Sequence, residues 1–122
     1  MPLKVSGPFH TSLMKPAGDA LAGKFKEVDF KDMQIPVLFN CLGDMKSEDD
    51  SIADLLEKQV QSSVYMDKTI ERLKALGVDT IIEIGPGKAL SGFVKKTVGS
   101  DIKCIPVEKV EDVEGLAEKL NA

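Results

Sequence analysis

The chain has 122 residues, of which 43% are hydrophobic and 30% charged, and its formal net charge is −4. This composition is typical of one folded globular domain and excludes a disordered or membrane-embedded protein. The acidic balance, with Arg72 as the only arginine, disfavours wrapping of nucleic acid. No apolar run approaches the roughly 20 residues that span a bilayer. We therefore expect a single domain over residues 1–122, located in the cytoplasm.

The first half of the chain contains apolar segments of strand and helix type, separated by polar turns. Gly7 and Pro8 break the first apolar segment, and Thr11 or Ser12 can cap the helix that follows. The order that we expect is a strand over 3–6, a helix over 13–25, a charged loop over 27–34, a strand over 37–41 and a polar turn over 43–50.

The second half continues this alternation. We expect a helix capped by Asp50 or Ser51, a helix between Ser63 and Gly77, a buried strand over 80–84, a helix over 88–98, a strand over 103–107 and an acidic helix over 112–120. Strands that alternate with helices at this spacing form βαβ units. The sequence therefore predicts an α/β fold with a mostly parallel sheet flanked by helices.

His10 is the only histidine, and it lies where the first strand passes into the first helix. Open α/β sheets place their chemistry at the carboxyl ends of their strands. A histidine can both accept and donate a proton near neutral pH, but it needs a nucleophile or a substrate proton within reach. His10 is therefore our first candidate for a catalytic residue.

No nucleophile in the chain carries a recognisable motif. A Gly-x-Ser-x-Gly turn is missing, and Ser91 lies inside a predicted helix where we expect an exposed or packing role. Cys41 and Cys104 lie in strand-like apolar segments, which favours buried free thiols, although counting alone leaves a disulfide open. One histidine and two distant cysteines offer no metal-ligand spacing, and we expect no cofactor.

The segment Gly85-Pro86-Gly87-Lys88 follows a strand and begins a helix, a geometry that can cradle phosphate. It matches neither the P-loop nor the dinucleotide-binding fingerprint, because the required further glycines are missing. We favour a tight strand-to-helix turn, and phosphate binding stays open as the alternative.

Three motifs occur in order along the chain: Val5-Ser6-Gly7-Pro8-Phe9-His10-Thr11-Ser12-Leu13-Met14-Lys15-Pro16-Ala17, then Gln59 before a pair of helices, then Glu83-Ile84-Gly85-Pro86-Gly87-Lys88-Ala89-Leu90-Ser91-Gly92. In these motifs the chain resembles malonyl-CoA:acyl carrier protein transacylases. The resemblance implies a partial α/β-hydrolase-like subdomain, namely the C-terminal part of the large subdomain. The nucleophilic serine of Gly-His-Ser-x-Gly, the arginine for the malonyl carboxylate and the oxyanion loop have no match in this chain.

The resemblance also implies roles for individual residues. His10 matches the catalytic histidine, which activates the serine for transfer of malonyl from CoA to the phosphopantetheine thiol of acyl carrier protein. Gln59 matches the residue whose backbone carbonyl orients that imidazole. Phe9 matches a specificity position, where a bulky ring disfavours an α-methyl group. Ser62-Ser63 departs from the Asn-Pro that relatives often carry, which leaves the loop shape open.

Two functions follow from these patterns. The first is the histidine-bearing segment of a malonyl transacylase, inactive without the rest of the enzyme. The second is a non-catalytic α/β module that binds acyl carrier protein or a phosphate-bearing ligand through Lys88, Lys95 and Lys96. In either case we expect exposed sheet edges, which favour self-association or pairing with the missing part of the enzyme.

Overall fold

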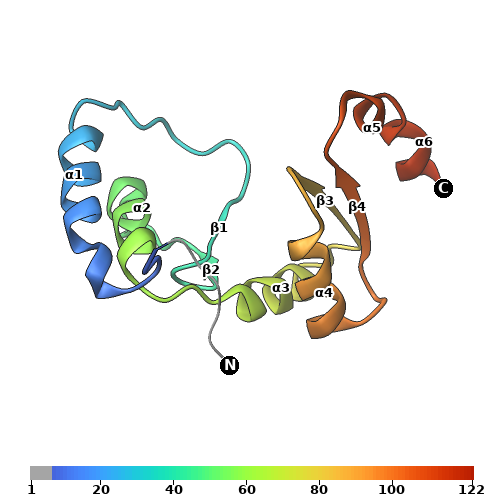
Figure 1. Cartoon of the computed structure of the whole chain (residues 1–122), viewed down its shortest axis with the longest axis horizontal. Coiled ribbons are helices and arrows are strands. Elements are labelled where there is room, and N and C mark those ends of the chain that lie inside the picture. The colour runs from blue at the N-terminus through green and yellow to red at the C-terminus, as the bar shows by residue number, and fades with distance from the viewer. Residues whose placement is uncertain (1–6) are drawn as a thin grey trace. The chain divides into compact units, whose positions relative to one another are not determined.

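The computed structural model describes residues 7–122 of the chain, so the predicted strand over 3–6 lies outside the described residues. The described chain forms two compact units, whose boundary lies between Thr69 and Ile70. Figure 1 shows both units, and each is described here by itself.

The first unit is built on two helices that pack side by side (Figure 1). A short 3-10 helix, η1 (Ser12–Met14), leads into α1 (Lys15–Phe25), with Pro16 in the first turn of α1, where no backbone N–H is required. The second helix, α2 (Ile52–Gln61), begins at Ser51, whose hydroxyl accepts a hydrogen bond from the Asp54 amide at 3.3 Å. The predicted Ser51 cap is therefore confirmed.

A two-stranded antiparallel hairpin joins these helices, where we expected one strand and a turn. Strand β1 (Leu38–Phe39) pairs with β2 (Asp44–Met45), and Gly43 between them has a φ of +71°. Such a left-handed conformation favours glycine, and a Cβ at this position would lie 2.8 Å from that of Lys68. The buried core of the unit consists of Phe39, Cys41 and Leu55, with Leu42, Ile52 and Leu56 packed against it.

The second unit contains the parallel pair that the sequence predicts. Strand β3 (Thr80–Ile84) runs parallel to β4 (Lys103–Val107), with Thr80 opposite Lys103 and Ile84 opposite Val107. Helix α4 (Ala89–Val98) connects the two strands and packs against β4 (Figure 1). The α/β fold class is confirmed, and within residues 7–122 the parallel sheet comprises β3 and β4, because β1 pairs with β2 instead.

Helix boundaries differ from the predicted ones at two places. Helix α3 (Met66–Ala75) begins three residues after Ser63, because residues 63–65 are not helical and the Tyr65 amide donates to the Asn40 carbonyl at 2.8 Å. The predicted C-terminal helix is two shorter ones, α5 (Val110–Glu114) and α6 (Leu116–Asn121), which meet at Gly115.

Burial along β3 is the reverse of the prediction for a buried apolar strand. Glu83 is 7% exposed, whereas Ile82 and Ile84 on the opposite face are 38% and 82% exposed. Successive side chains of a strand point to opposite faces, and within the second unit only the face that carries Glu83 lies under α4. Leu13, an apolar residue at the start of the predicted helix over 13–25, is likewise 74% exposed.

Candidate active site

His10 lies in the turn that precedes η1 and adopts a left-handed backbone, with a φ of +61°. It is the only non-glycine residue in the described chain with a positive φ. For a residue with a side chain this conformation costs about 1–2 kcal/mol, so surrounding contacts must hold it in place.

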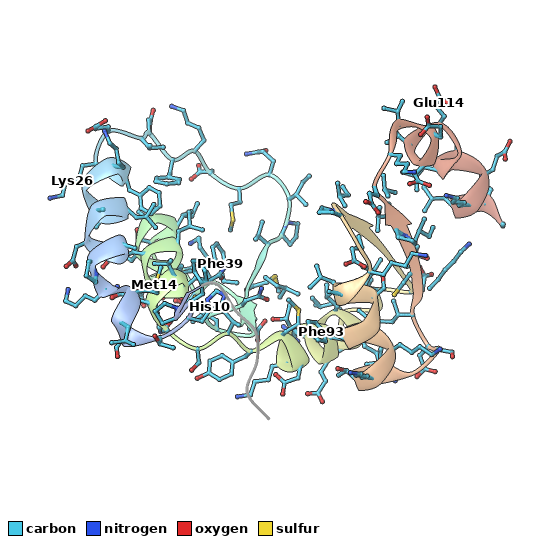
Figure 2. The ribbon with its side chains drawn as sticks, in the orientation of Figure 1. His10, Met14, Lys26, Phe39, Phe93 and Glu114 are labelled. Atoms are coloured by element: carbon cyan, nitrogen blue, oxygen red, sulfur yellow. The ribbon has the colours of Figure 1, made fainter. Side chains whose placement is uncertain are left out.

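Figure 2 labels His10 in the first unit. Two carbonyls of the last turn of α2 hold it. The His10 ring nitrogen Nδ1 lies 2.8 Å from the Gln59 carbonyl oxygen, and the His10 amide donates to the Val60 carbonyl at 3.2 Å. Carbonyls in the last turn of a helix lack an intrahelical partner, which leaves them free to accept these bonds. The hydrogen bond between His10 and the Gln59 backbone that the resemblance implies is therefore present.

This arrangement fixes the proton on one nitrogen of the imidazole. A carbonyl oxygen only accepts hydrogen bonds, so Nδ1 must carry the hydrogen and Nε2 must be the basic nitrogen when the ring is neutral. His10 is exposed, and among residues 7–122 its Nε2 has no hydrogen-bond partner. The side chain is therefore able to take a proton from a group presented to it from outside the described chain.

Ser62 closes the C-terminal end of α2. The hydroxyl of Ser62 donates to the Lys58 carbonyl, and Ser62 itself is extended, with φ −133° and ψ 164°. Three successive carbonyls, those of Lys58, Gln59 and Val60, are thus satisfied by side-chain or backbone donors. The partial negative charge at this helix end also stabilises a positive charge on a nearby imidazole.

Phe9, the predicted specificity residue, is 54% exposed next to His10. Its ring lies over the backbone of Gly7, where a Cβ would approach the Phe9 ring to 3.2 Å. A side chain at position 7 would therefore displace the ring. The glycine lets the aromatic ring lie close to the backbone of the turn.

A second polar cluster, which the sequence analysis missed, lies at the start of α4. The buried carboxylate of Glu83 accepts hydrogen bonds from the amides of Leu90 and Ser91, both at 2.9 Å, and from the Ser91 hydroxyl. The Ser91 hydroxyl, followed by the Ser91 and Leu90 amides, holds the pKa of Glu83 below its ordinary value. An acidic residue in an apolar strand, a few residues before a helix, was the available signal.

Glu83 favours one of the two interpretations of the glycine-rich turn, the strand-to-helix connection. A phosphate at a helix N-terminus needs free amide donors, but Glu83 already occupies those of Leu90 and Ser91. The amide of Gly87 donates to the Glu108 carboxylate at 3.4 Å. The turn is thus a strand-to-helix connection in which the amides of Gly87, Leu90 and Ser91 donate to carboxylates of the chain itself.

The remaining predicted residues lie apart from these clusters. Lys95 and Lys96 are exposed on α4, and neither forms an ion pair within the described chain. Lys95 lines a cavity of about 470 Å³ with Ser91, Lys103 and Cys104, among others.

The two cysteines are free thiols in different units. Cys41 is buried, its Sγ lies 3.5 Å from the Leu55 carbonyl, and burial raises the pKa of its thiol. A raised pKa disfavours the reactive thiolate, so Cys41 is a core residue. Residues 7–122 contain no group of three or more side chains suited to a metal ion. None of their helices combines the length and the apolar character needed to cross a membrane.

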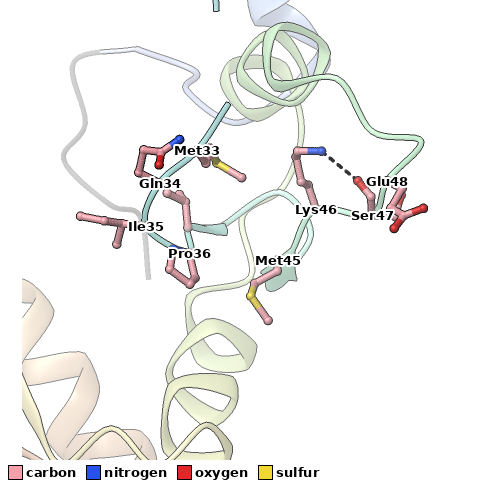
Figure 3. Close-up of a pocket in the computed structure, with 9 residues that line it drawn as sticks. Met33, Gln34, Ile35, Pro36, Met45, Lys46, Ser47 and Glu48 are labelled. Atoms are coloured by element: carbon pink, nitrogen blue, oxygen red, sulfur yellow. Dashed lines mark hydrogen bonds between the residues drawn. The ribbon is translucent and has the colours of Figure 1, made fainter. Parts of the chain in front are cut away.

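An open groove of about 380 Å³ lies elsewhere in the first unit, between residues 33–37 and the hairpin (Figure 3). Met33, Ile35, Pro36 and Met45 give it a largely apolar lining, and the Lys46 ammonium donates to the carbonyls of Ser47 and Asp50. His10 does not line this groove, so the groove and the candidate active site are separate features.

Comparison with known proteins connects this geometry with one family of enzymes. The chain is 46% identical over 114 residues to malonyl CoA-acyl carrier protein transacylase of Bacillus subtilis (strain 168), an alignment that covers 93% of this chain and 36% of the relative. No protein-family model matches the chain.

Solved structures agree with this match. The crystal structure of malonyl CoA-acyl carrier protein transacylase from Clostridium perfringens has a TM-score of 0.89 and 40% identity, over 99% of this chain and 38% of that one. A malonyl-transacylase in complex with its type II PKS acyl-carrier protein has a TM-score of 0.85 and 32% identity, over 98% of this chain and 38% of that one.

The predicted resemblance is therefore confirmed. The chain spans a little over a third of the length of the relatives that it matches, at 36–38% of each.

Proposed function

We propose that this chain is the C-terminal segment of a malonyl-CoA:acyl carrier protein transacylase, and that it supplies the catalytic histidine, His10. The observation that carries the proposal is the 2.8 Å hydrogen bond between the His10 ring and the Gln59 carbonyl. This bond leaves the basic Nε2 exposed and unpartnered within residues 7–122, which is the arrangement required of a general base. In this proposal residues 1–122 form one continuous part of the enzyme's large subdomain.

The reaction requires a serine hydroxyl from the rest of the enzyme. Nε2 of His10 takes the hydroxyl proton as the serine oxygen attacks the thioester carbon of malonyl-CoA, and the imidazolium then protonates the departing CoA thiolate. The product is a malonyl-serine ester. In the second half-reaction His10 takes the proton of the phosphopantetheine thiol, whose sulfur attacks the ester, and the serine recovers its proton.

Gln59 acts in this proposal through its backbone alone. Its carbonyl holds Nδ1–H and keeps the ring in one tautomer, which is the task that a carboxylate performs in a serine–histidine–aspartate triad. A neutral carbonyl gives the imidazolium less stabilisation than a full negative charge does. The end of α2 supplies part of the difference through the helix dipole.

Phe9 contributes substrate preference. Because it directly precedes His10 and is exposed, its ring is available to crowd a substituent on the α-carbon of the acyl group. One methyl group in a pocket changes discrimination by about 1–3 kcal/mol. We therefore propose a preference for malonyl over methylmalonyl rather than strict exclusion.

The partners in this proposal are malonyl-CoA, acyl carrier protein and the remaining part of the enzyme. Exposed Ile82 and Ile84 on β3 support the last of these, since an uncovered apolar strand face favours a covering partner or self-association. Lys95 and Lys96, exposed and without an ion pair in the described chain, are the proposed contact for an acidic carrier. Free thiols at Cys41 and Cys104 are consistent with a cytoplasmic enzyme of fatty-acid synthesis.

A complementation experiment tests the proposal. The chain is assayed for transfer of malonyl from malonyl-CoA to acyl carrier protein, alone and after co-expression with the serine-bearing remainder of a malonyl transacylase. We expect no transfer by the chain alone and restored transfer by the pair. Transfer by the isolated chain, or a pair that forms but stays inactive, would contradict the proposal.

A further inference from the structure

The hydroxyl of Thr11 is not used in the way expected of a residue that precedes a helix. Thr11 is the residue before η1, where a threonine ordinarily accepts a hydrogen bond from an amide of the first turn. Here the side chain makes no such bond, and Oγ1 donates instead to the Pro8 carbonyl at 2.7 Å. The hydroxyl thus points back across the two residues between them, Phe9 and His10.

These two residues form the turn that needs a restraint. His10 has a φ of +61°, a conformation from which a residue with a Cβ tends to relax. The bond from Thr11 to Pro8 closes the turn on both sides of His10 and opposes that relaxation. In the described chain this is the only side-chain hydrogen bond that joins two residues of the segment 8–11, because the His10 ring bonds to Gln59 outside the segment.

Both contacts of His10 with α2 depend on this backbone conformation. The amide and Nδ1 of one residue reach two successive carbonyls, those of Val60 and Gln59. Rotation about φ swings the side chain relative to the amide, so a relaxed backbone cannot keep both bonds. The turn therefore determines which ring nitrogen of His10 carries the hydrogen.

We propose that Thr11 is a positioning residue for His10, whose hydroxyl holds the left-handed turn and thereby the bond from Nδ1–H to the Gln59 carbonyl. The effect that Thr11 has on malonyl transfer rests on the proposed function. The effect that it has on the tautomer of the imidazole is independent of that function, because it depends only on contacts within the chain.

The first experiment reads the imidazole directly. His10 is the only histidine, so ¹⁵N-histidine labelling of the full chain gives one pair of ring nitrogens in the NMR spectrum. We expect the wild type at about pH 8.5 to show the Nδ1–H tautomer. Thr11→Val and Thr11→Ala should shift the ring towards the Nε2–H tautomer, whereas Thr11→Ser should keep the wild-type signal because it retains the hydroxyl.

The second experiment measures transfer by the complemented enzyme. Thr11→Val should lower kcat about fivefold with little change in KM, on the scale of one neutral hydrogen bond. Thr11→Ser should remain close to the wild type. The matched control is Thr97→Val on α4, which removes a similar bond, from the Thr97 hydroxyl to the Phe93 carbonyl at 2.9 Å, and should change neither readout.

The outcomes separate this inference from the proposed function. A wild-type tautomer in both Thr11→Val and Thr11→Ala would overturn the inference, and so would a Thr11→Ser variant that behaves as Thr11→Val does. If the tautomer shifts as expected but replacement of His10 leaves transfer intact, the proposed function fails and the positioning of the ring by Thr11 stands.

Discussion

The C-terminal end of α2 and the N-terminal end of α4 are both closed by a side chain from another part of the chain, but to different extents. At the end of α2, His10 uses its amide and one ring nitrogen, and its Nε2 stays exposed and unpartnered within residues 7–122. At the start of α4, the Glu83 carboxylate is 7% exposed and accepts three hydrogen bonds.

The difference separates a group that can react from one that stabilises the fold. Helix ends leave backbone groups unsatisfied, and any suitable side chain can satisfy them. Glu83 has both carboxylate oxygens engaged, so little capacity remains for a ligand. His10 is held by two hydrogen bonds, yet it presents a basic nitrogen to the outside, and this combination of restraint and access is what catalysis requires.

The largest expected effect is the loss of malonyl transfer on replacement of His10, which separates its role as a base from its role in the fold. In His10→Asn the base is lost, but asparagine tolerates the left-handed backbone. We expect malonyl transfer by the complemented enzyme to fall about 10³-fold, while the free energy of unfolding of the chain changes by less than about 1 kcal/mol. Steady-state kinetics and urea unfolding measure the two quantities.

His10→Ala provides the matched control for this prediction. It removes the base as well, so transfer should be equally low, but alanine at a φ of +61° should cost about 1 kcal/mol more of stability than asparagine does. Transfer that persists in both variants would show that His10 is only a structural residue.

An intermediate effect is expected at Glu83, and it concerns stability and its pH dependence. Hydrogen bonds from the Ser91 hydroxyl and from the amides of Ser91 and Leu90 lower the pKa of Glu83 from its ordinary value of 4.5. A carboxylate with a lowered pKa in the folded state stabilises that state above its ordinary value and loses this contribution as the pH falls through the lowered pKa. Glu83→Gln should therefore lower Tm by about 5 °C at pH 7.

The pH dependence of this Tm difference tests whether the Glu83 carboxylate causes it. The Tm difference between wild type and Glu83→Gln should be complete above about pH 4.5 and should shrink as the pH falls below it. Thermal unfolding followed by circular dichroism from pH 7 to pH 3 measures it. Glu114→Gln, which replaces an exposed carboxylate without a hydrogen bond in the described chain, is the control. A constant difference across this range would contradict the role assigned to Glu83.

The smallest expected effect is on stability, at a helix end whose closing hydrogen bonds are all between backbone groups. Helix α3 ends at Ala75, and Gly77 closes the turn that follows it. Gly77 has a φ of +82° and its amide donates to the Lys74 carbonyl at 3.0 Å, while the Val78 amide donates to the Leu73 carbonyl at 3.1 Å. Nothing lies within 4 Å of a Cβ at position 77, so Gly77→Ala should cost only the conformational penalty, about 1 kcal/mol.

Gly23 provides a control with the opposite expected sign for the Gly77 substitution. It lies inside α1, and no atom lies within 4 Å of the place that a Cβ would take, so Gly23→Ala should instead stabilise the chain by about 0.5–1 kcal/mol. Urea unfolding of both variants measures the two opposite signs. Equal signs would show that backbone conformation does not set the stability of these two positions.

Local sequence signals predicted the elements of the second unit well. The apolar run of β3, the Gly85-Pro86-Gly87 turn and the apolar segment of β4 place both strands at their observed residues. The hairpin of β1 and β2 was missed, because each strand has only two residues and carries no alternating pattern long enough to detect. The resemblance alone predicted the bond between His10 and Gln59, which are 49 residues apart in the chain.

The sequence by itself determined the α/β class, the position of His10 before the first helix and the resemblance to malonyl transacylases, because these depend on local patterns and on the order of motifs. Tertiary structure alone decided that Glu83 closes α4, that Ile84 is exposed and that His10 adopts a left-handed turn against α2. Such features depend on which unsatisfied helix-end groups lie near which side chains, and that proximity exists only once the chain has folded.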